Sequence, residues 1–374
     1  MVTQKLRRSG TEWLPHKFGI TPPTPPANRD GLIAGIHKPD ASNTGPYTVS
    51  SWAEQDPSTG TSITISTPGT YYGKRYWGTV KVTAPDNTVF FRECWFAGPH
   101  PTSPTGDLTS CIQTFGSSPK KFEVWDSILD PSVWQSIRGV SPDFQTAYIC
   151  GIHGGNIRVY RTEITNVQDG WNWIGPSATP AADLQQTTLQ QCWIHKGYYV
   201  NDWYDARAPD GQPHCDAFQT NYGRNLLIKG NTLGGVRNIT GYNIWPGGYN
   251  SGDDFWNAGL QLSQEVDDND LHRIRNVTIE QNWIGGGTSS INHARDPDNP
   301  GAWTENCFIR DNKFLTRGSD WGVKMKGDGF GLPGYDNTTS PASGYYIIRH
   351  SSFAGMYSNN TTEETGAPVP IVNG

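Results

Sequence analysis

The sequence predicts an all-β chain: a single-stranded, right-handed parallel β-helix of about eight or more coils with an N-terminal cap. One short phrase recurs eight times, and the first residues of successive copies are 30 to 51 positions apart. Each copy has an apolar residue (Thr187 in one copy), a spacer, an apolar residue, two spacers, a small or amide residue, a spacer and an apolar residue. The copies are Val89-Phe91-Cys94-Phe96, Phe122-Val124-Ser127-Leu129, Ile157-Val159-Thr162-Ile164, Thr187-Leu189-Cys192-Ile194, Leu226-Ile228-Asn231-Leu233, Val277-Ile279-Asn282-Ile284, Cys307-Ile309-Asn312-Phe314 and Tyr346-Ile348-Ser351-Phe353. A repeat of this length, built on alternating residues in a chain with almost no capped helical pattern, is typical of stacked coils.

The spacing inside the phrase predicts a strand followed by a corner. Two apolar residues separated by one position give a strand with one buried face. A small or amide side chain then suits a tight bend, because Asn tolerates left-handed backbone angles and bonds nearby backbone groups. Stacking should therefore bring Asn231, Asn282 and Asn312 into a ladder of amide hydrogen bonds. The alternative is ordinary turns in a β-sandwich, but sandwich strands recur about every 8–12 residues and would not keep this register.

Composition narrows the class of protein further. The chain has 374 residues, 34% of them hydrophobic, with 43 glycines and 27 prolines, which suits many turns around a thin core. A net charge of −6 with both signs dispersed disfavours a nucleic-acid partner. The sequence contains no apolar run of about 18 residues, so it predicts no membrane span. No apolar run follows Lys5, Arg7 and Arg8, so we expect no signal peptide.

The six cysteines resemble an even disulfide set, but the register argues against pairing. Cys94 and Cys192 occupy the same corner position three coils apart, which places them about 14 Å from each other along the stack. That is beyond the reach of a disulfide. We expect small buried apolar side chains in a protein that folds in a reducing cytosol.

Four segments follow from these patterns. Residues 1–30 are expected to be an N-terminal anchor and proline-rich linker, with a disordered leader as the alternative. Residues 31–85 are the expected N-terminal cap, because the open sheet edges at the end of a β-helix need cover. Residues 86–355 hold the eight coils, and residues 356–374 form a tail that caps or leaves the last coil.

A second strand precedes the phrase in most coils and ends in a polar residue. If its apolar member points inward, the polar members form an outward column along the stack. Amides and a lysine there are suitable partners for sugar hydroxyls and acidic groups, and the alternative is a solvated face. The predicted column consists of Gln113, Gln219, Gln261, Asn292 and Lys324.

Carboxylates gather near a histidine at residues 202–219. We assign candidate catalytic roles to Asp205, His214 and Asp216, because cleavage of a glycosidic bond needs one group to protonate the leaving oxygen and another to activate water or attack. Strict alternation would put Asp216 and Phe218 on one face, so a bend must intervene between them. The alternative is that Asp216 and His214 satisfy backbone groups at a coil corner. No metal or cofactor is expected, although Asp267, Asp268 and Asp270 are a weak candidate cation site.

Aromatic residues are abundant, with 15 Trp and 16 Tyr. Trp95, Trp193 and Trp283 follow the corner residue and should point outward, which is unusual for Trp. They are expected to stack on sugars or to be covered by a long loop or a neighbouring subunit, and burial in a homotrimer is preferred. The candidate substrate-binding residues outside the column are Asp202, Trp203, Tyr204, Trp245 and Trp256, and Trp171 and Trp173 are further loop candidates.

Residues 31–355 resemble the pectate-lyase-like β-helix superfamily, and within it the minor tail proteins and tailspikes of bacteriophages that infect high-GC Gram-positive bacteria. The resemblance rests on residues 39–45 (Pro-Asp-Ala-Ser-Asn-Thr-Gly), 78–82 (Gly-Thr-Val-Lys-Val) and 276–284 (Asn-Val-Thr-Ile-Glu-Gln-Asn-Trp-Ile) and on the motif His-x-Asp-x-x-Gln at His214, Asp216 and Gln219. It implies a virion component, assembled in the host cytoplasm, that recognises host cell-surface polysaccharide and joins other tail proteins through its N-terminal segment. Tailspikes of this type are commonly trimeric.

Two departures from the superfamily keep the question of enzyme activity open. The polygalacturonase-type set of Gly-His-Gly and Arg-Ile-Lys is absent, and no convincing cluster of calcium-binding carboxylates is present. If the protein is an enzyme, a glycoside hydrolase is favoured over a lyase. The competing hypotheses are a non-catalytic structural or receptor-binding tail-tip component and a free polysaccharide hydrolase or lyase.

Overall fold

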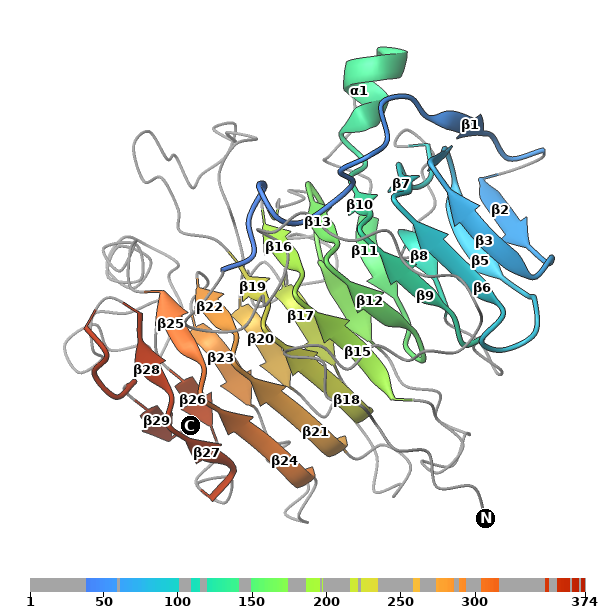
Figure 1. Cartoon of the computed structure of the whole chain (residues 1–374). Coiled ribbons are helices and arrows are strands. Elements are labelled where there is room, and N and C mark those ends of the chain that lie inside the picture. Colours follow the sequence, from blue (N-terminus) through green and yellow to red (C-terminus); the bar gives the residue numbers. More distant parts are fainter. Residues whose placement is uncertain are drawn as a thin grey trace, which may run out of the picture.

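The chain is a parallel β-helix built from three sheets. The computed structural model describes residues 38–58, 61–100, 109–114, 120–140, 149–173, 186–195, 197, 216–220, 223–234, 258–262, 274–285, 289–293, 304–315, 347–349, 355–363, 365–369 and 371–373. Every strand pairs in parallel with its counterpart one coil away, so the strands stack into three long sheets (Figure 1). This arrangement confirms the predicted fold class.

We name the sheets A, B and C. Sheet A contains, in spatial order, β1 (Ala53–Gln55), β4 (Lys74–Tyr76), β7 (Trp95–Phe96), β10 (Ile128–Leu129), β13 (Glu163–Thr165), β16 (Trp193–His195), β19 (Thr232–Leu233), β22 (Trp283–Gly285), β25 (Lys313–Leu315) and β28 (Thr361–Thr362). Sheet B contains β2 (Ser62–Ile65), β5 (Thr79–Val82), β8 (Thr109–Gln113), β11 (Ile149–His153), β14 (Trp171–Trp173), β17 (Asp216–Thr220), β20 (Ala258–Leu262), β23 (Ser289–His293), β26 (Ile347–Arg349) and β29 (Ile371–Asn373). Sheet C contains β3 (Gly69–Tyr72), β6 (Val89–Arg92), β9 (Glu123–Trp125), β12 (Arg158–Tyr160), β15 (Thr187–Gln190), β18 (Arg224–Lys229), β21 (Ile274–Glu280), β24 (Thr304–Arg310) and β27 (Tyr357–Ser358).

The recurring phrase marks the passage from sheet C to sheet A in seven of its eight copies. In the first copy, Val89 and Phe91 lie in β6 and Phe96 lies in β7. The eighth copy is wrong, because β26 belongs to sheet B and pairs with β23. The last passage from C to A is instead made by β27 and β28, where Tyr357 pairs with Ile309 and Thr362 with Phe314. The recurring phrase did not predict this passage, because Thr362 replaces its final apolar residue.

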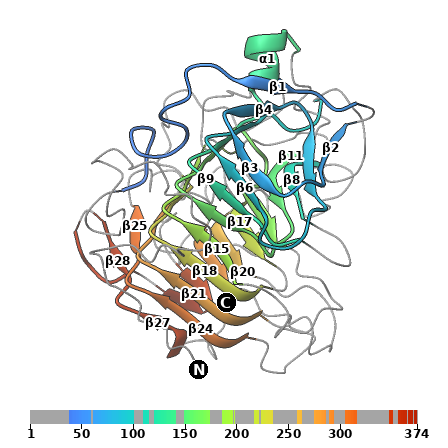
Figure 2. The same cartoon turned by 45° about the vertical axis from the view of Figure 1, so that its right-hand side comes forward.

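The inward residues of the three sheets form one continuous core. Phe91, Val159 and Ile279 of sheet C are fully buried together with their counterparts in sheets A and B, and Figure 2 shows the sheets enclosing this core. Among the described cysteines, all are free and buried, as predicted, and burial raises the pKa of the Cys94 and Cys192 thiols to about 12. The described cysteines are Cys94, Cys111, Cys150, Cys192 and Cys307.

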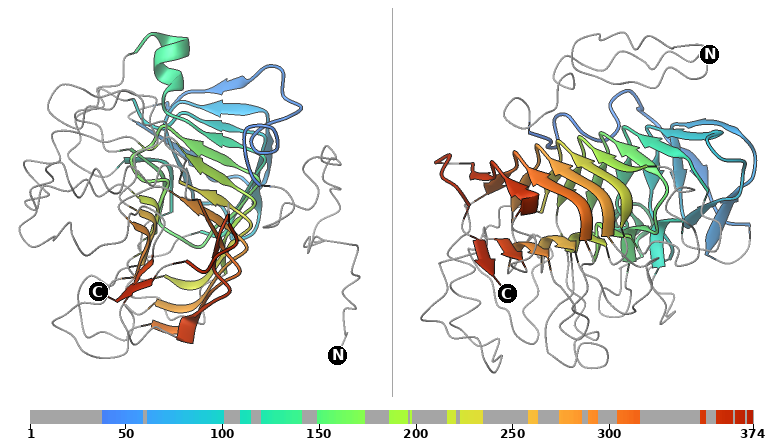
Figure 3. Two further views of the ribbon diagram at one scale, coloured as in Figure 1. Left: turned by 90° about the vertical axis from the view of Figure 1, so that its left-hand side faces the viewer. Right: turned by 90° about the horizontal axis from the view of Figure 1, so that it is seen from below.

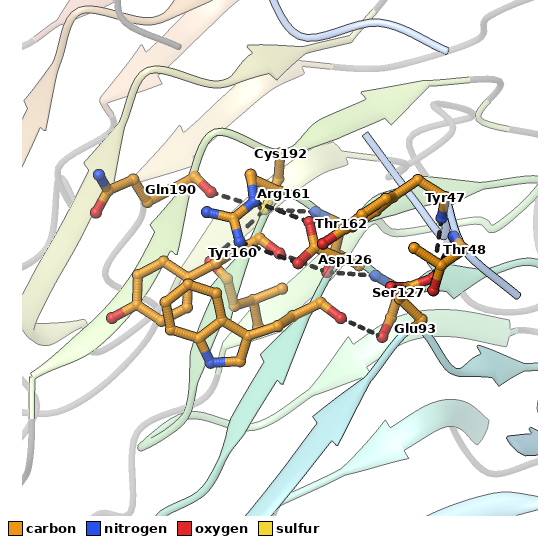
Figure 4. Close-up of polar contacts among 12 residues, drawn as sticks. Tyr47, Thr48, Glu93, Asp126, Ser127, Tyr160, Arg161, Thr162, Gln190 and Cys192 are labelled. Atoms are coloured by element: carbon orange, nitrogen blue, oxygen red, sulfur yellow. Dashed lines mark hydrogen bonds and ion pairs between the residues drawn. The ribbon is translucent and has the colours of Figure 1, made fainter. Parts of the chain in front are cut away.

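A two-residue corner joins sheet C to sheet A. Its first residue has left-handed backbone angles, with φ of 46° at Glu93, 48° at Asp126 and 45° at Arg161. Left-handed angles were expected at the second residue, but the side chain there serves another purpose: the Ser127 hydroxyl accepts from the Cys94 amide at 3.0 Å. Figure 4 shows this corner, where the Arg161 guanidinium donates to both carboxylate oxygens of buried Asp126 at 2.8 and 3.0 Å.

The predicted amide ladder forms at the second corner residue and is one step longer than expected. Asn231, Asn282, Asn312 and Asn360 stack in successive coils. In the first three, the backbone N–H and the side-chain Nδ2 both donate to Oδ1 of the next Asn, at 2.9 to 3.2 Å. Each Nδ2 also donates to a backbone carbonyl of sheet C, as Asn282 does to Ile228 at 3.0 Å. The ladder therefore ties four coils together through groups that would otherwise be buried without partners.

Residues 38–52, which we call the N-terminal strap, run back along the stack from its last coil toward its first. Lys38 pairs with Glu363 of the last coil at 3.2 Å, and the Pro39 carbonyl accepts from Thr232 at 2.8 Å. Further along, the Glu93 carboxylate accepts from three successive backbone amides, those of residues 47–49. Figure 3 shows the strap passing across the coils. Residues 53–82, part of the expected N-terminal cap, supply the first strands of all three sheets.

Trp side chains on the outer face of sheet A are half-buried (Trp95, Trp193) or buried (Trp283) within the chain. Trp95 meets Trp52 of the strap edge-on at 5.5 Å, Trp193 stacks on His195 at 3.4 Å, and Trp283 is only 3% exposed. One helix that the sequence did not predict, α1 (Val133–Arg138), packs Trp134 on Trp77 above the same face. Burial between protomers is therefore not needed to explain these Trp residues.

None of the helices in the described part of the chain is long and apolar enough to cross a membrane.

Candidate functional site

A column of polar side chains runs along the outer face of sheet B. We call it the polar column: Gln113, His153, Asn172, Gln219, Gln261 and Asn292, which pair in register from β8 to β23. Four of the five members expected from the sequence, Gln113, Gln219, Gln261 and Asn292, lie in this register. His153 and Asn172 were missed. In the next strand, the position after Asn292 is Ile348, and Lys324 lies outside the described residues.

Two consecutive residues pack toward the core just before the column member in several strands of sheet B. The residue immediately before a column member in the sequence is apolar and fully buried, as at Ile112, Phe218 and Leu260. The residue before that is small, and at Gly170 an added Cβ would lie 2.4 Å from Ile194 of sheet A and 2.3 Å from the Ala217 carbonyl oxygen. Two consecutive residues therefore approach the core, and alternation is interrupted as the sequence required.

The sequence contains a signal for the two missed members. The six column members each end a four-residue pattern. Its first position varies, its second is small, its third is apolar and its fourth is the polar column member. The copies are Ser110-Cys111-Ile112-Gln113, Cys150-Gly151-Ile152-His153, Asp169-Gly170-Trp171-Asn172, Asp216-Ala217-Phe218-Gln219, Ala258-Gly259-Leu260-Gln261 and Ser289-Ser290-Ile291-Asn292. The pattern also places Trp171 and Trp173 in β14 rather than in a loop, with Trp171 in the core.

Two carboxylates, Asp169 and Asp216, occupy the first position of this four-residue pattern in neighbouring coils. Asp169 Oδ1 accepts from the Asp216 amide at 2.9 Å, and Asp216 Oδ1 accepts in turn from the Ala258 amide at 2.9 Å. Both residues are fully buried. These contacts agree with the alternative given above for Asp216, in which it satisfies backbone groups at a corner.

Asp169 also connects to the polar column. Asn172 Nδ2 donates to Asp169 Oδ2 at 3.1 Å and to Gln219 Oε1 at 3.3 Å. These two acceptors fix the orientation of the Asn172 amide, since its oxygen could not face them favourably. Asn172 Oδ1 is buried and has no hydrogen-bond partner within the described part of the chain, and the same is true of Gln261 Oε1.

His153 occupies the column one coil before Asn172 and is 7% exposed. Burial disfavours the imidazolium and lowers the pKa of His153 from 6.5 to about 4. The side chain is therefore neutral near pH 7 and adds hydrogen-bonding capacity to the column without charge.

Acid should destabilise the fold through His153. Its folded-state pKa is below its unfolded value, so its contribution is complete above pH 6.5 and is lost as pH falls toward 4, by up to about 3 kcal/mol. We expect urea midpoints to fall between pH 6.5 and 4, and His153→Gln to flatten that fall. His100→Gln, at a half-buried histidine outside the column, is the control. An unchanged slope in His153→Gln would contradict the assignment.

Among the described strands, the long connections from β6 onward begin or end at sheet B. From β6 onward the chain passes from sheet C to sheet A in two residues, whereas residues 196–215, 234–257 and 316–346 join sheet A to sheet B, and 263–273 and 294–303 join sheet B to sheet C. The remaining candidates from the sequence fall in three of these connections, outside the described residues. They are Asp202, Trp203, Tyr204, Asp205, His214, Trp245, Trp256 and Lys324.

No group of three or more His, Cys, Asp or Glu in the described residues is placed to hold a metal ion. The carboxylates of Asp267, Asp268 and Asp270 lie outside those residues.

Comparisons with known proteins add a distant likeness. No protein-family model and no curated protein matches the sequence. Among solved structures, the chain is similar to the A-module of the mannuronan C-5 epimerase AlgE6 of Azotobacter vinelandii, with 9% identity over 84% of each chain and a TM-score of 0.32. It is also similar to the catalytic domain of a GH87 alpha-1,3-glucanase in complex with nigerose, with 11% identity over 95% of this chain and 70% of that one and a TM-score of 0.28.

Proposed function

We propose that the outer face of sheet B binds an extended polysaccharide of a bacterial cell surface, and that the protein is a minor tail or tailspike component of a bacteriophage virion. The observation that carries the binding proposal is the polar column, held in register over six neighbouring strands. The phage assignment draws its support from the sequence resemblance at residues 39–45, 78–82, 276–284 and around Asp216.

The column suits a polymer of repeated hydroxyl groups. Side-chain amides both donate and accept hydrogen bonds, as sugar hydroxyls do. Successive members lie on strands about 4.8 Å apart, so one extended chain along the stack would meet several of them in turn. Candidates such as Trp203 and Trp245 belong to segments that start at the end of a sheet A strand and end at a strand of sheet B.

Cleavage of the bound chain is the finer part of the proposal. Asp205, His214 and Asp216 remain the candidates for acid–base chemistry, with hydrolysis preferred to lyase chemistry. One observation favours the second candidate function, a non-catalytic receptor-binding component: Asp216 is fully buried and its Oδ1 is engaged by the Ala258 amide. A homotrimer joined to other tail proteins through residues 1–30 completes the proposal, and sedimentation equilibrium tests the trimer.

Shortening Gln219 should weaken polysaccharide binding about tenfold, since one hydrogen bond contributes about 0.5–1.5 kcal/mol and 1.4 kcal/mol is a factor of ten. Retardation in gels that contain cell-envelope polysaccharide of a high-GC Gram-positive bacterium measures the affinity of Gln219→Ala. The matched control is Gln190→Ala, because Gln190 is a half-buried amide at the end of a strand in sheet C.

New reducing ends and unsaturated-sugar absorbance are followed in the same samples. Reducing ends alone indicate a hydrolase, and both signals indicate a lyase. Retention without either signal selects the non-catalytic candidate. Equal losses in the sheet B and sheet C variants would refute sheet B as the binding face.

A further inference from the structure

The described members of the polar column from Gln113 to Asn292 carry no charge near pH 7. They are amides and one histidine that burial keeps neutral. The charged side chain that contacts the column at Asn172 is acidic: Asn172 donates to Asp169. Lys81 pairs with Gln113 at one end of the column. At the other end, the register brings Ile348 and not a lysine next to Asn292.

Two members of the column present acceptors rather than donors. Asn172 is 8% exposed, and both of its contacts use Nδ2, which leaves Oδ1 buried without a partner in the described part of the chain. Gln261 Oε1, two coils further along, is in the same condition. A buried acceptor without a partner costs about 1–3 kcal/mol, and a donor from a ligand would recover it.

The chemistry of these groups discriminates between two kinds of glycan. A hydroxyl group donates to an amide oxygen, whereas an ionised carboxylate or phosphate only accepts. A carboxylate or phosphate placed against Asn172 Oδ1 would therefore leave that oxygen unsatisfied, would lie near the Asp169 carboxylate and would meet no basic member of the column between Gln113 and Asn292. Recognition of a carboxylate or phosphate usually relies on Arg or Lys.

We propose that the site takes an uncharged, hydroxyl-rich polysaccharide, with Asn172 and Gln261 accepting hydrogen bonds from sugar hydroxyls, and that it discriminates against polyuronates and other polyanionic glycans. This inference rests on the proposed function, because it specifies the substrate class of the same face.

Affinity electrophoresis of the full chain at low salt tests the inference. The gels contain either a neutral glycan (dextran, galactan or arabinogalactan) or a polyuronate (polygalacturonate or alginate), and a third set contains the cell-envelope polysaccharide used above. We expect retardation by at least one neutral glycan and none by the polyuronates. Asn172→Ala, which removes the Oδ1 acceptor, should reduce neutral-glycan affinity about tenfold.

A charge introduced into the column should change the selectivity. We expect Gln261→Lys to gain polyuronate retardation, while Gln190→Lys, which adds the same charge on sheet C, gains none. Polyuronate binding by the unaltered protein would overturn this inference and leave the proposed function in place. No retardation by any glycan, the envelope polysaccharide included, would overturn the proposed function itself, and this inference with it.

Discussion

Replacing Asn282 by alanine should lower the free energy of unfolding by about 3–5 kcal/mol, one of the two largest effects that we expect in this chain. Asn282 is fully buried and makes four side-chain hydrogen bonds. Its Oδ1 accepts from the backbone and side-chain nitrogens of Asn231, and its Nδ2 donates to Ile228 and Asn312. Alanine leaves the buried Asn231 backbone N–H without this acceptor and removes the other three bonds, although Asn231 Nδ2 keeps its bond to Leu189 and Asn312 Oδ1 keeps the backbone N–H of residue 282. Urea denaturation followed by Trp fluorescence measures the change.

The chain offers a matched control for this substitution in a second asparagine ladder, which is exposed. Asn276 donates to Asn225 at 3.0 Å and accepts from Asn306 at 3.1 Å, with φ of 54°. Asn276→Gly keeps the left-handed backbone accessible and removes contacts that water can replace, so a loss below about 1 kcal/mol is expected. Similar losses at the two positions would show that burial is not what makes the inner ladder strong.

Adding a single methyl group at Gly170 should be as damaging. The new Cβ would lie 2.3 Å from the Ala217 carbonyl oxygen and 2.4 Å from Ile194 Cγ2. Real contacts are much longer, and the first of these neighbours is backbone that cannot rotate away. We expect Gly170→Ala to cost about 3 kcal/mol or more, or to prevent folding.

Gly355→Ala is the control for Gly170→Ala, because a Cβ there meets nothing within 4 Å. It should change stability by no more than about 0.5 kcal/mol. Circular dichroism of the purified variants and the soluble fraction on expression distinguish misfolding from destabilisation. A Gly170→Ala protein as stable as the parent would mean that sheets A and B can move apart at this corner, against the close packing described here.

The fold could be predicted because its determinants are local and repeated. Three features recur at fixed spacing: the alternating pair in sheet C, the corner residue and the final apolar residue of sheet A. In the middle of the stack, each copy of the phrase therefore predicts the positions of its two strands. The ends were harder. At Thr362 a polar residue takes the final position, and β3, which begins at Gly69, lacks the first apolar residue. The six-residue α1 depends on Trp134 packing against Trp77, a contact between coils that no local pattern contains.

The site was predicted in part for the same reason. Gln113, Gln219, Gln261 and Asn292 repeat an apolar–amide pair, whereas His153 breaks the amide pattern and Asn172 follows a Trp that suggested a loop. The role of Asp169 depends on its stacking beneath Asp216, across an interval of 47 residues. Lys324 was predicted to belong to the column only because an apolar residue precedes it. The strand that pairs with β23 instead consists of residues 347–349.

The N-terminal strap determines how the rod should respond to mechanical load. The strap touches the last coil at Glu363, a middle coil at Thr232 and an early coil at Glu93, while the chain runs on from it into β1. A pull on Lys38 directed away from the early coils would act along the strap and load these attachments in shear, together, rather than peeling one coil after another. We expect such a tether to resist force better than a terminal coil attached only through its sheet edge.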